Sequence, residues 1–341
     1  MSSVPTNVPS VAPDVGPDVT PDAARDRGAG RGRRRELQAA PKSARTKAEA
    51  RLGWWLAGPA FVIMVAVIFY PVLQALWDSL FSYRLTAPDE REFIGLQNYA
   101  TILTDGVFWS ALGVTALITV ITVFVELILG FILAMVMHKA IKSTRGLVRT
   151  VILVPYGIIT VVSAFAWYYM FSIDSGYVNN WLSWVPGFDD QLNWFAQGGT
   201  ALFVIMFSEI WKTTPFISLL LLAGLAQVPE DLSEAAAVDG ANWWQRLWRV
   251  ILPNMKAAIM VAVLFRALDA FRVFDSIFIM TNGAYGTEVL SLLAYRTSIG
   301  RLEIGLGSAI SVVLFLLVGL IALIAVKGFN VDLAGGRGGR K

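Results

Sequence analysis

Charged side chains interrupt the longest apolar stretches of this 341-residue chain, and they are the first candidates for chemistry. An Asp, Lys or Arg at the centre of a membrane helix costs about 2.5–3.5 kcal/mol on insertion scales, so each one needs a partner or a function. Glu209 and Lys212 lie three residues apart, close enough to pair on one helix face. The other charges of this kind are Glu126, Arg266, Asp269, Arg272 and Asp275.

Two interpretations of these intramembrane charges stay open from the residues alone. The series 266–275 alternates in sign at three-residue spacing, so its members can pair and hold helices together or face a partner chain. Glu126 stands alone in its segment and needs a partner from another helix. Alternatively, the charged groups form a polar pathway for a hydroxyl-rich solute, beside aromatic stacking faces. The candidates for such a pathway are Glu209, Lys212, Asp269, Arg272, Asp275, Trp211 and Phe271.

The composition excludes most catalytic chemistry. The chain has no Cys and a single His, His138, which leaves no thiolate nucleophile and no Cys- or His-based metal site. No G-x-x-x-x-G-K-[ST] loop occurs in the sequence, so the chain cannot supply an ATP site of that type. We therefore expect no catalytic residue, no metal and no cofactor bound by this chain.

The elements that must hold the intramembrane charges are long apolar helices. Hydrophobic residues make up 56% of the chain and charged residues only 16%, against about 25% charged residues in soluble domains. Crossing about 30 Å of hydrocarbon takes about 20 apolar residues, and a helix satisfies its own backbone hydrogen bonds in lipid. We therefore predict an all-α polytopic membrane protein. Its six transmembrane helices are expected at 54–80, 108–138, 146–173, 200–226, 254–280 and 303–327.

Lys and Arg residues predict how these helices are oriented. Residues 1–53 combine regularly spaced prolines with a basic cluster, and we expect a disordered cytoplasmic tail that rests on anionic lipids and binds no nucleic acid. Most other Lys and Arg residues in the connections lie on the same side as this tail, so both termini should be cytoplasmic. The membrane domain is expected at 54–330, followed by a flexible basic tail at 331–341.

One cytoplasmic connection, residues 227–253, is predicted to form helices of its own. Asp231 or Ser233 is expected to cap a short helix, and Gly240 lets the backbone turn after it. A second amphipathic helix follows, with basic residues on one side and an apolar face made of Trp244, Leu247 and Trp248. From the residues alone, this helix pair suits either the inner membrane leaflet or a protein partner.

The same loop resembles the EAA motif of ABC importer permeases, whose pattern is EAA-x3-G-x9-I-x-L-P. The match comprises Glu234, Ala235, Ala236, Gly240, Leu252 and Pro253, with Val250 in place of the usual Ile. Other segments resemble the carbohydrate-uptake branch of this family, which includes maltose, trehalose and glycerol-phosphate permeases. These segments are 93–99, 210–216, 222–225, 274–275, 280–283, 287–288 and 295–297.

This resemblance implies the permease subunit of a type I ABC importer, working with several partners. They are a second permease subunit, a dimer of ATP-binding-cassette ATPases that holds ATP and Mg, and an extracytoplasmic solute-binding protein or lipoprotein. The helix around Glu234 would be the coupling helix, seated in a cleft of the ATPase, with Glu234 paired to a basic group there. The complex would lie in a bacterial plasma membrane and import a carbohydrate, such as the disaccharides trehalose or maltose.

Other functions compete with a sugar permease. A permease of the same architecture could import glycerol phosphate, a polyamine or an amino acid, although the mixed signs of the intramembrane charges argue against a phosphorylated solute. A membrane-embedded enzyme would need paired carboxylates, or a Ser/Lys or His constellation, near one face. A secondary transporter would usually show internal repeats and discontinuous helices.

Overall fold

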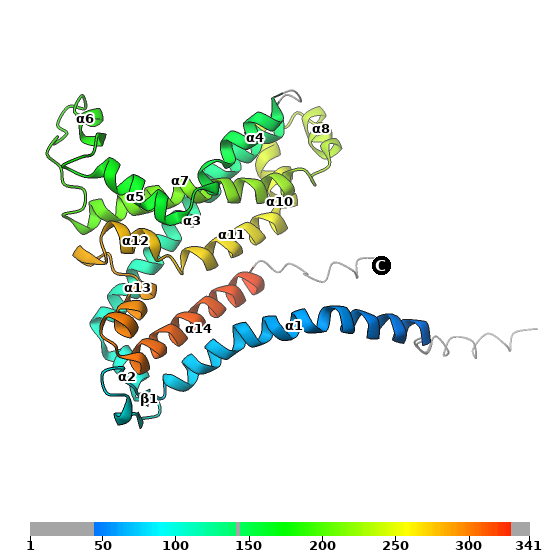
Figure 1. The fold of residues 1–341 in the computed structure, drawn as a ribbon. Helices are drawn as coiled ribbons and strands as arrows, with labels where there is room; N and C mark the ends of the chain where they lie inside the picture. The colour runs from blue at the N-terminus through cyan, green and yellow to red at the C-terminus, as the bar shows by residue number, and fades with distance from the viewer. Residues whose placement is uncertain (1–43, 141–143, 329–341) are drawn as a thin grey trace, which may run out of the picture. The chain divides into compact units, whose positions relative to one another are not determined.

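The computed structural model describes residues 44–140 and 144–328, and most of them are helical (Figure 1). The described residues divide into two units between Val67 and Ile68. The long helices are α1 (Ala44–Asp78), α3 (Gly106–Lys139), α7 (Gly198–Leu225) and α14 (Ile304–Gly328). The shorter ones are α2 (Gln97–Thr104), α4 (Arg145–Leu153), α5 (Thr160–Phe171), α6 (Val178–Leu182), α8 (Glu230–Val238), α9 (Trp243–Arg246), α10 (Leu252–Asn254), α11 (Lys256–Ala270), α12 (Asp275–Met280) and α13 (Leu290–Tyr295).

Several tighter or wider turns and one small hairpin connect these helices. The 3₁₀ segments are η1 (Pro88–Glu90), η2 (Pro155–Gly157) and η4 (Ala284–Gly286), and the π-helical segments are η3 (Leu247–Ile251) and η5 (Arg296–Gly300). Strands β1 (Phe81–Ser82) and β2 (Glu92–Phe93) pair in antiparallel orientation.

Four of the described helices are long and apolar enough to cross a membrane. They cover Arg51–Asp78, Gly106–Lys139, Gly198–Leu225 and Ile304–Lys327. These helices match the first, second, fourth and sixth segments predicted from the sequence. The third and fifth predicted segments, 146–173 and 254–280, are not continuous helices, which corrects the expectation of six uninterrupted ones.

The two interrupted segments break for different reasons. In the third segment, Pro155 follows α4 and cannot donate to the helical ladder, so a 3₁₀ turn precedes α5. In the fifth segment, α11 ends at Ala270 and Phe274 has the non-helical torsions φ −140° and ψ −59°. The hydroxyl of Ser291 donates to the carbonyl of Val273, so this freed backbone group is satisfied.

The first helix begins earlier than the sequence analysis predicted. Helix α1 starts at Ala44, which places the expected tail boundary at residue 53 inside a helix. The stretch 44–53 is rich in Ala, Arg, Lys and Glu, which all favour helix, and this explains the difference. The rest of the predicted N-terminal tail and the predicted C-terminal tail, 331–341, lie outside the described residues.

Helices α3, α7 and α11 pack against one another around the intramembrane charges. Gly130 of α3 allows close contact with α7, since a Cβ atom at this position would lie 2.7 Å from Cγ2 of Ile217. Small residues at such positions let membrane helices approach closely. Glu126 and Thr213 each lie one helical turn before these two residues, so the same close approach brings their polar groups together.

Candidate functional site

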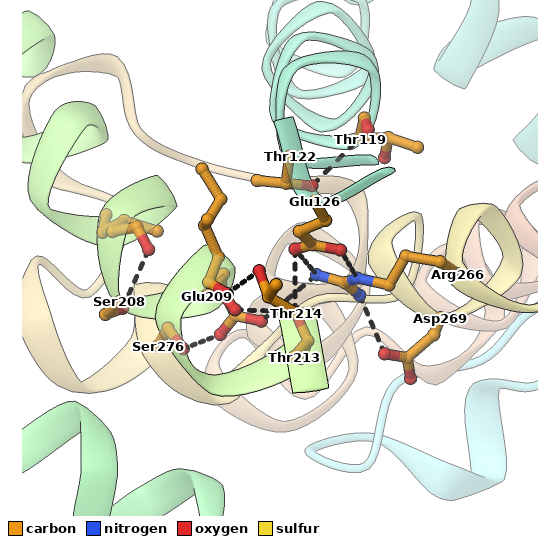
Figure 2. A network of polar contacts seen from close by, with 12 residues as sticks. Thr119, Thr122, Glu126, Ser208, Glu209, Thr213, Thr214, Arg266, Asp269 and Ser276 are labelled. Carbon is orange, nitrogen blue, oxygen red and sulfur yellow. Dashed lines mark hydrogen bonds and ion pairs between the residues drawn. The ribbon is translucent and has the colours of Figure 1, made fainter. Parts of the chain in front are cut away.

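Arg266 of α11 lies at the centre of a buried network of polar side chains (Figure 2). Its Nε and Nη2 atoms donate to the two carboxylate oxygens of Glu126 on α3, at 2.5 and 3.0 Å. Its Nη2 atom also lies 3.6 Å from Oε2 of Glu209 on α7. Its Nη1 atom donates to Oδ2 of Asp269, one turn further along α11, at 2.8 Å. Arg266 is 2% exposed and Glu126 is fully buried, so water does not replace these contacts.

Two hydroxyl groups complete the network and extend it to a fourth helix. Thr213 of α7 donates to Oε1 of Glu126 at 2.7 Å, and Ser276 of α12 donates to Oε1 of Glu209. Two parallel bonds from one guanidinium to one carboxylate are the strong geometry for such a pair. Removing one partner of a buried pair typically costs about 3–5 kcal/mol, because the other charge stays buried. The network therefore ties α3, α7, α11 and α12 together.

The structure separates the two charges that the sequence suggested as a pair on α7. Among the described residues, Glu209 pairs with Arg266, and Lys212 forms no ion pair. The Nζ atom of Lys212 instead lies 5.9 Å from the centroid of the Tyr156 ring. The reason is that Glu209 faces the interior of the helix cluster, where a guanidinium from another helix reaches it.

The two predicted aromatic faces have different surroundings. Trp211 is 38% exposed and packs edge-on against Trp167, with 5.5 Å between the ring centroids. Phe271 is only 6% exposed and lies in the core beside Phe108 and Leu290. The chain therefore leaves part of the Trp211 ring uncovered, whereas Phe271 is packed in the core.

The remaining predicted residues are charged side chains that are exposed or half-buried. The side chain of Asp269 is 67% exposed although it accepts a bond from Arg266. Arg272 is exposed and donates to the carbonyl of Leu268, and Asp275 is half-buried at the start of α12. These groups can hydrogen-bond a polar solute or a neighbouring subunit.

Glu126 and Arg266 were predicted as intramembrane charges but not as site residues, and Thr213 and Ser276 were not predicted at all. The signal that could have found them was available, because a lone carboxylate in an apolar segment must have a partner elsewhere. The prediction that Glu126 takes its partner from another helix is confirmed by Arg266, which lies 140 positions further along the chain.

A second candidate site is the exposed helix α8, which carries the EAA residues. Gly240 has the left-handed torsion φ +82°. Its N–H donates to the carbonyl of Ala237 at 3.1 Å, and the N–H of Ala241 donates to that of Ala236 at 2.9 Å. This is the Schellman pattern of helix termination, in which the residue after the cap must be left-handed. The spacing between Ala236 and Gly240 in the motif is thus the spacing of a helix stop, and the predicted turn is confirmed.

The predicted start of α8 was wrong. Pro229 occupies the N-cap position, and neither Asp231 nor Ser233 caps the helix through its side chain. Proline fixes the entering backbone without a side-chain hydrogen bond. Glu230 and Asp231 lie instead in the first turn, where carboxylates interact favourably with the helix dipole.

The predicted second amphipathic helix is divided into three segments. Asn242 and Gln245 form a capping box that starts α9, and the π-helical η3 and α10 follow. Leu247 is buried, while Trp244 and Trp248 are 62% and 64% exposed. Of the three residues predicted to form one apolar face, Leu247 is therefore covered by its own chain, whereas Trp244 and Trp248 are not.

The EAA residues lie open to a partner. Helix α8 has no buried residue, and Glu234, Ala235 and Pro253 are exposed. Beside Glu234 lies an open pocket of about 290 Å³, which also contacts Lys139 of α3. Because little of α8 packs against its own chain, this helix can be covered by another protein.

Comparison with known proteins identifies the family to which the chain is similar. Residues 126–331 match the family described as "Binding-protein-dependent transport system inner membrane component". The trehalose transport system permease protein SugA of Mycobacterium tuberculosis (strain ATCC 25618 / H37Rv) is 49% identical over 289 residues, which cover 85% of this chain and 92% of that protein. The trehalose/maltose transport system permease protein MalF of Thermococcus litoralis is 37% identical, and the match covers 82% of this chain and 94% of that protein.

Solved structures show the same fold. A chain in the crystal structure of a bacterial ABC transporter that imports the acidic polysaccharide alginate matches with a TM-score of 0.72 at 23% identity, covering 85% of this chain and 99% of that chain. A second structure shows a bacterial alginate transporter in complex with its periplasmic protein, which holds an alginate pentasaccharide. It matches with a TM-score of 0.72 at 22% identity, covering 85% of this chain and 98% of that chain.

Proposed function

The chain belongs to the family of binding-protein-dependent transport system inner membrane components, and on this premise we propose that it is the permease subunit of an ATP-binding-cassette importer for a disaccharide. The observation that carries the proposal is α8, an exposed EAA helix that a Schellman turn ends at Gly240. The names of the relatives at 49% and 37% identity support trehalose or maltose as the solute. The subunit is a transport component, and ATP and Mg belong to its ATPase partners.

The proposed topology has six crossings with both termini in the cytoplasm. Four crossings are the long helices α1, α3, α7 and α14, and the other two are the broken pairs α4–α5 and α11–α12. This assignment places the connection from α3 to α4 and the loop 227–253 on the cytoplasmic side. The excess of Lys and Arg on that side supports the orientation.

Coupling to ATP hydrolysis would go through α8. In the proposed complex, α8 is seated in a cleft of an ATPase dimer, and the exposed carboxylate of Glu234 accepts a hydrogen bond from a basic group there. The fixed backbone at Gly240 sets the direction in which the chain leaves α8, so a push on α8 is passed to α10 and α11. A second permease and a solute-binding protein complete the assembly, and the complex of the alginate transporter with its periplasmic protein supports the latter.

The proposed solute pathway runs beside the Arg266 network. Trp211 offers a partly free ring, and Asp269 and Arg272 offer charged hydrogen-bonding groups, which together suit a hydroxyl-rich neutral molecule. Glu126 and Arg266 lie behind these groups, fully paired, and hold their helices in place.

The experiment that tests this function is transport by the reconstituted complex. The chain, its second permease, its ATPase and its solute-binding protein are placed in vesicles loaded with ATP, and uptake of labelled trehalose is measured with maltose and glycerol phosphate as competitors. We expect uptake that requires both ATP and the binding protein, and that either disaccharide inhibits. Competition by glycerol phosphate alone, or uptake without ATP, would contradict the proposal.

A further inference from the structure

A basic groove lies where α3 and α4 meet the end of α7. It has a volume of about 460 Å³ and is lined on one side by His138, Arg145 and Arg149. Glu230 at the start of α8 is the acidic residue in its lining. Arg145 and Arg149 are four residues apart on α4, so their side chains share one face of that helix. The two guanidinium groups outweigh the single carboxylate, and the groove attracts anions.

The arginines of this groove have N–H donors that form no hydrogen bond within the described part of the chain. Arg145 uses Nη2 to donate to the carbonyl of His138, 3.3 Å away, which fixes it against the end of α3. The Nε atoms of Arg145 and Arg149 are shielded from solvent and have no acceptor within the described part of the chain, so a ligand in the groove would meet the outer Nη groups of these arginines. A guanidinium donates to several oxygens in a fixed planar arrangement, which suits a phosphate group better than a single carbonyl.

The opposite wall of the groove is apolar and belongs to a membrane helix. It consists of Leu219, Leu222, Ala223 and Ala226, whose i, i+3, i+4, i+7 spacing places them on one face of the last turns of α7 and its C-cap. From residue 219 to residue 226 the helix rises about 10 Å. The headgroup layer on each side of a bilayer is only about 5–7 Å thick, so such a wall continues from the headgroups into the hydrocarbon.

We propose that this groove binds an anionic phospholipid of the cytoplasmic leaflet. Its phosphate lies between Arg145 and Arg149, and the upper part of an acyl chain lies along the stripe on α7. An acidic segment of the ATPase would match the arginines but would leave the apolar wall uncovered, whereas a phospholipid matches both sides. The assignment to the cytoplasmic leaflet depends on the proposed orientation of the chain, but lipid binding itself does not depend on the proposed transport function.

The test measures which lipid stays with the purified complex. The complex is reconstituted in nanodiscs of phosphatidylcholine with added phosphatidylglycerol, extracted in mild detergent, and its retained lipids are counted by native mass spectrometry. The charge-removing variant is R145Q/R149Q, and R145K/R149K keeps the charges. The matched control is K256Q/K327Q, which removes two exposed basic residues proposed for the same side but outside the groove.

We expect the wild-type complex to retain phosphatidylglycerol in preference to phosphatidylcholine. Each basic residue near an anionic surface strengthens the binding of the lipid. Losing two of them in R145Q/R149Q should therefore lower the retention of phosphatidylglycerol about tenfold to thirtyfold. R145K/R149K should keep most of the binding, and K256Q/K327Q should retain lipid as the wild type does.

Three results would overturn the proposal. Equal retention of phosphatidylglycerol in R145Q/R149Q and wild type would show that the groove is not the site. Displacement of the lipid by inorganic phosphate at low concentration would identify a site for free phosphate. Loss of the ATPase from R145Q/R149Q with unchanged lipid would identify an acidic protein segment as the occupant. Sugar uptake is measured separately, so a failure of the proposed transport function would not be confused with any of these.

Discussion

Glu126 and Glu234 are the same residue type, but they lie in two regions of the molecule with opposite surroundings. Glu126 is fully buried in α3, and both of its oxygens accept bonds from Arg266 or Thr213. Glu234 is exposed on α8, which packs little against its own chain. The buried carboxylate has its hydrogen-bond partners within the chain, and the exposed one remains available to another molecule.

This contrast separates residues that hold the fold from residues that we propose contact the ATPase. In the Arg266 network, the side chains determine the stability, because charges buried without partners are costly. In the EAA loop, the proposed coupling function depends on the backbone, because the Schellman turn at Gly240 sets the direction of the chain. Substitutions in the network should therefore lower stability, and substitutions in the loop should lower coupling in a stable protein.

The strongest test of this contrast replaces Arg266 with Met. The change leaves the carboxylates of Glu126 and Glu209 buried without their cation, and we expect a loss of about 3–5 kcal/mol. The measurement is thermal unfolding of the detergent-solubilised protein, followed by size-exclusion chromatography. The double variant E126L/R266M removes both members of the main pair and should recover much of the stability. A single variant as stable as wild type would show that the network is not structural.

A smaller loss is expected when Thr213 is replaced with Val. Val keeps the shape but removes the bond to the charged Glu126, and a hydrogen bond to a charged group contributes about 1.5–3 kcal/mol. We expect the lower end of this range, because Arg266 still donates to both oxygens of Glu126. The control is Thr214→Val, since Thr214 donates only to the carbonyl of Ile210 on its own helix. Equal melting temperatures for the two variants would contradict this prediction.

Replacing Gly240 with Val tests the role of the turn in the EAA loop. A left-handed torsion costs a residue with a Cβ atom roughly 1–2 kcal/mol, and a β-branched residue tolerates it worst. The strain is confined to an exposed turn, so the protein should reach the membrane in normal amounts while ATP-driven uptake is abolished. Gly240→Asn is the control, because Asn adopts this conformation more readily and should keep part of the uptake. Normal uptake by the Val variant would disprove the assigned role of the turn.

The smallest effect on stability is expected for Glu234→Gln. An exposed substitution of this kind changes the free energy of unfolding by no more than about 0.5 kcal/mol. Co-purification of the ATPase should nevertheless fall several-fold, because the amide cannot pair with a basic group of the partner. Asp239→Asn removes a charge from the same loop outside the EAA residues and should leave the complex intact. If both variants bind the ATPase as the wild type does, Glu234 is not a contact.

Local features of the sequence predicted much of this molecule. The four long helices follow from apolar length, and the turn at Gly240 follows from a residue type that tolerates a left-handed torsion. Pro155 marked the break in the third segment, although the prediction treated that segment as one helix. In each of these cases the physical cause lies within a few residues of its effect.

The rest depended on contacts between distant residues. That Glu126 needs a partner followed from its position, but nothing local identified Arg266 among the several cations in other segments. The break between α11 and α12 contains neither Pro nor Gly, so the sequence gives no local sign of it. Ser291, which accommodates the break by donating to the carbonyl of Val273, lies in another helix.

The break after Ala270 gives the proposed α11–α12 crossing two separate attachments to its neighbours. Helix α11 is attached through Arg266 chiefly to α3, and α12 is attached through Ser276 to Glu209 on α7. Arg266 also lies 3.6 Å from Glu209, so both halves are attached to α7, and the non-helical residues 271–274 lie between the two attachments. These four residues let α11 and α12 take different directions while each helix keeps its own backbone hydrogen bonds.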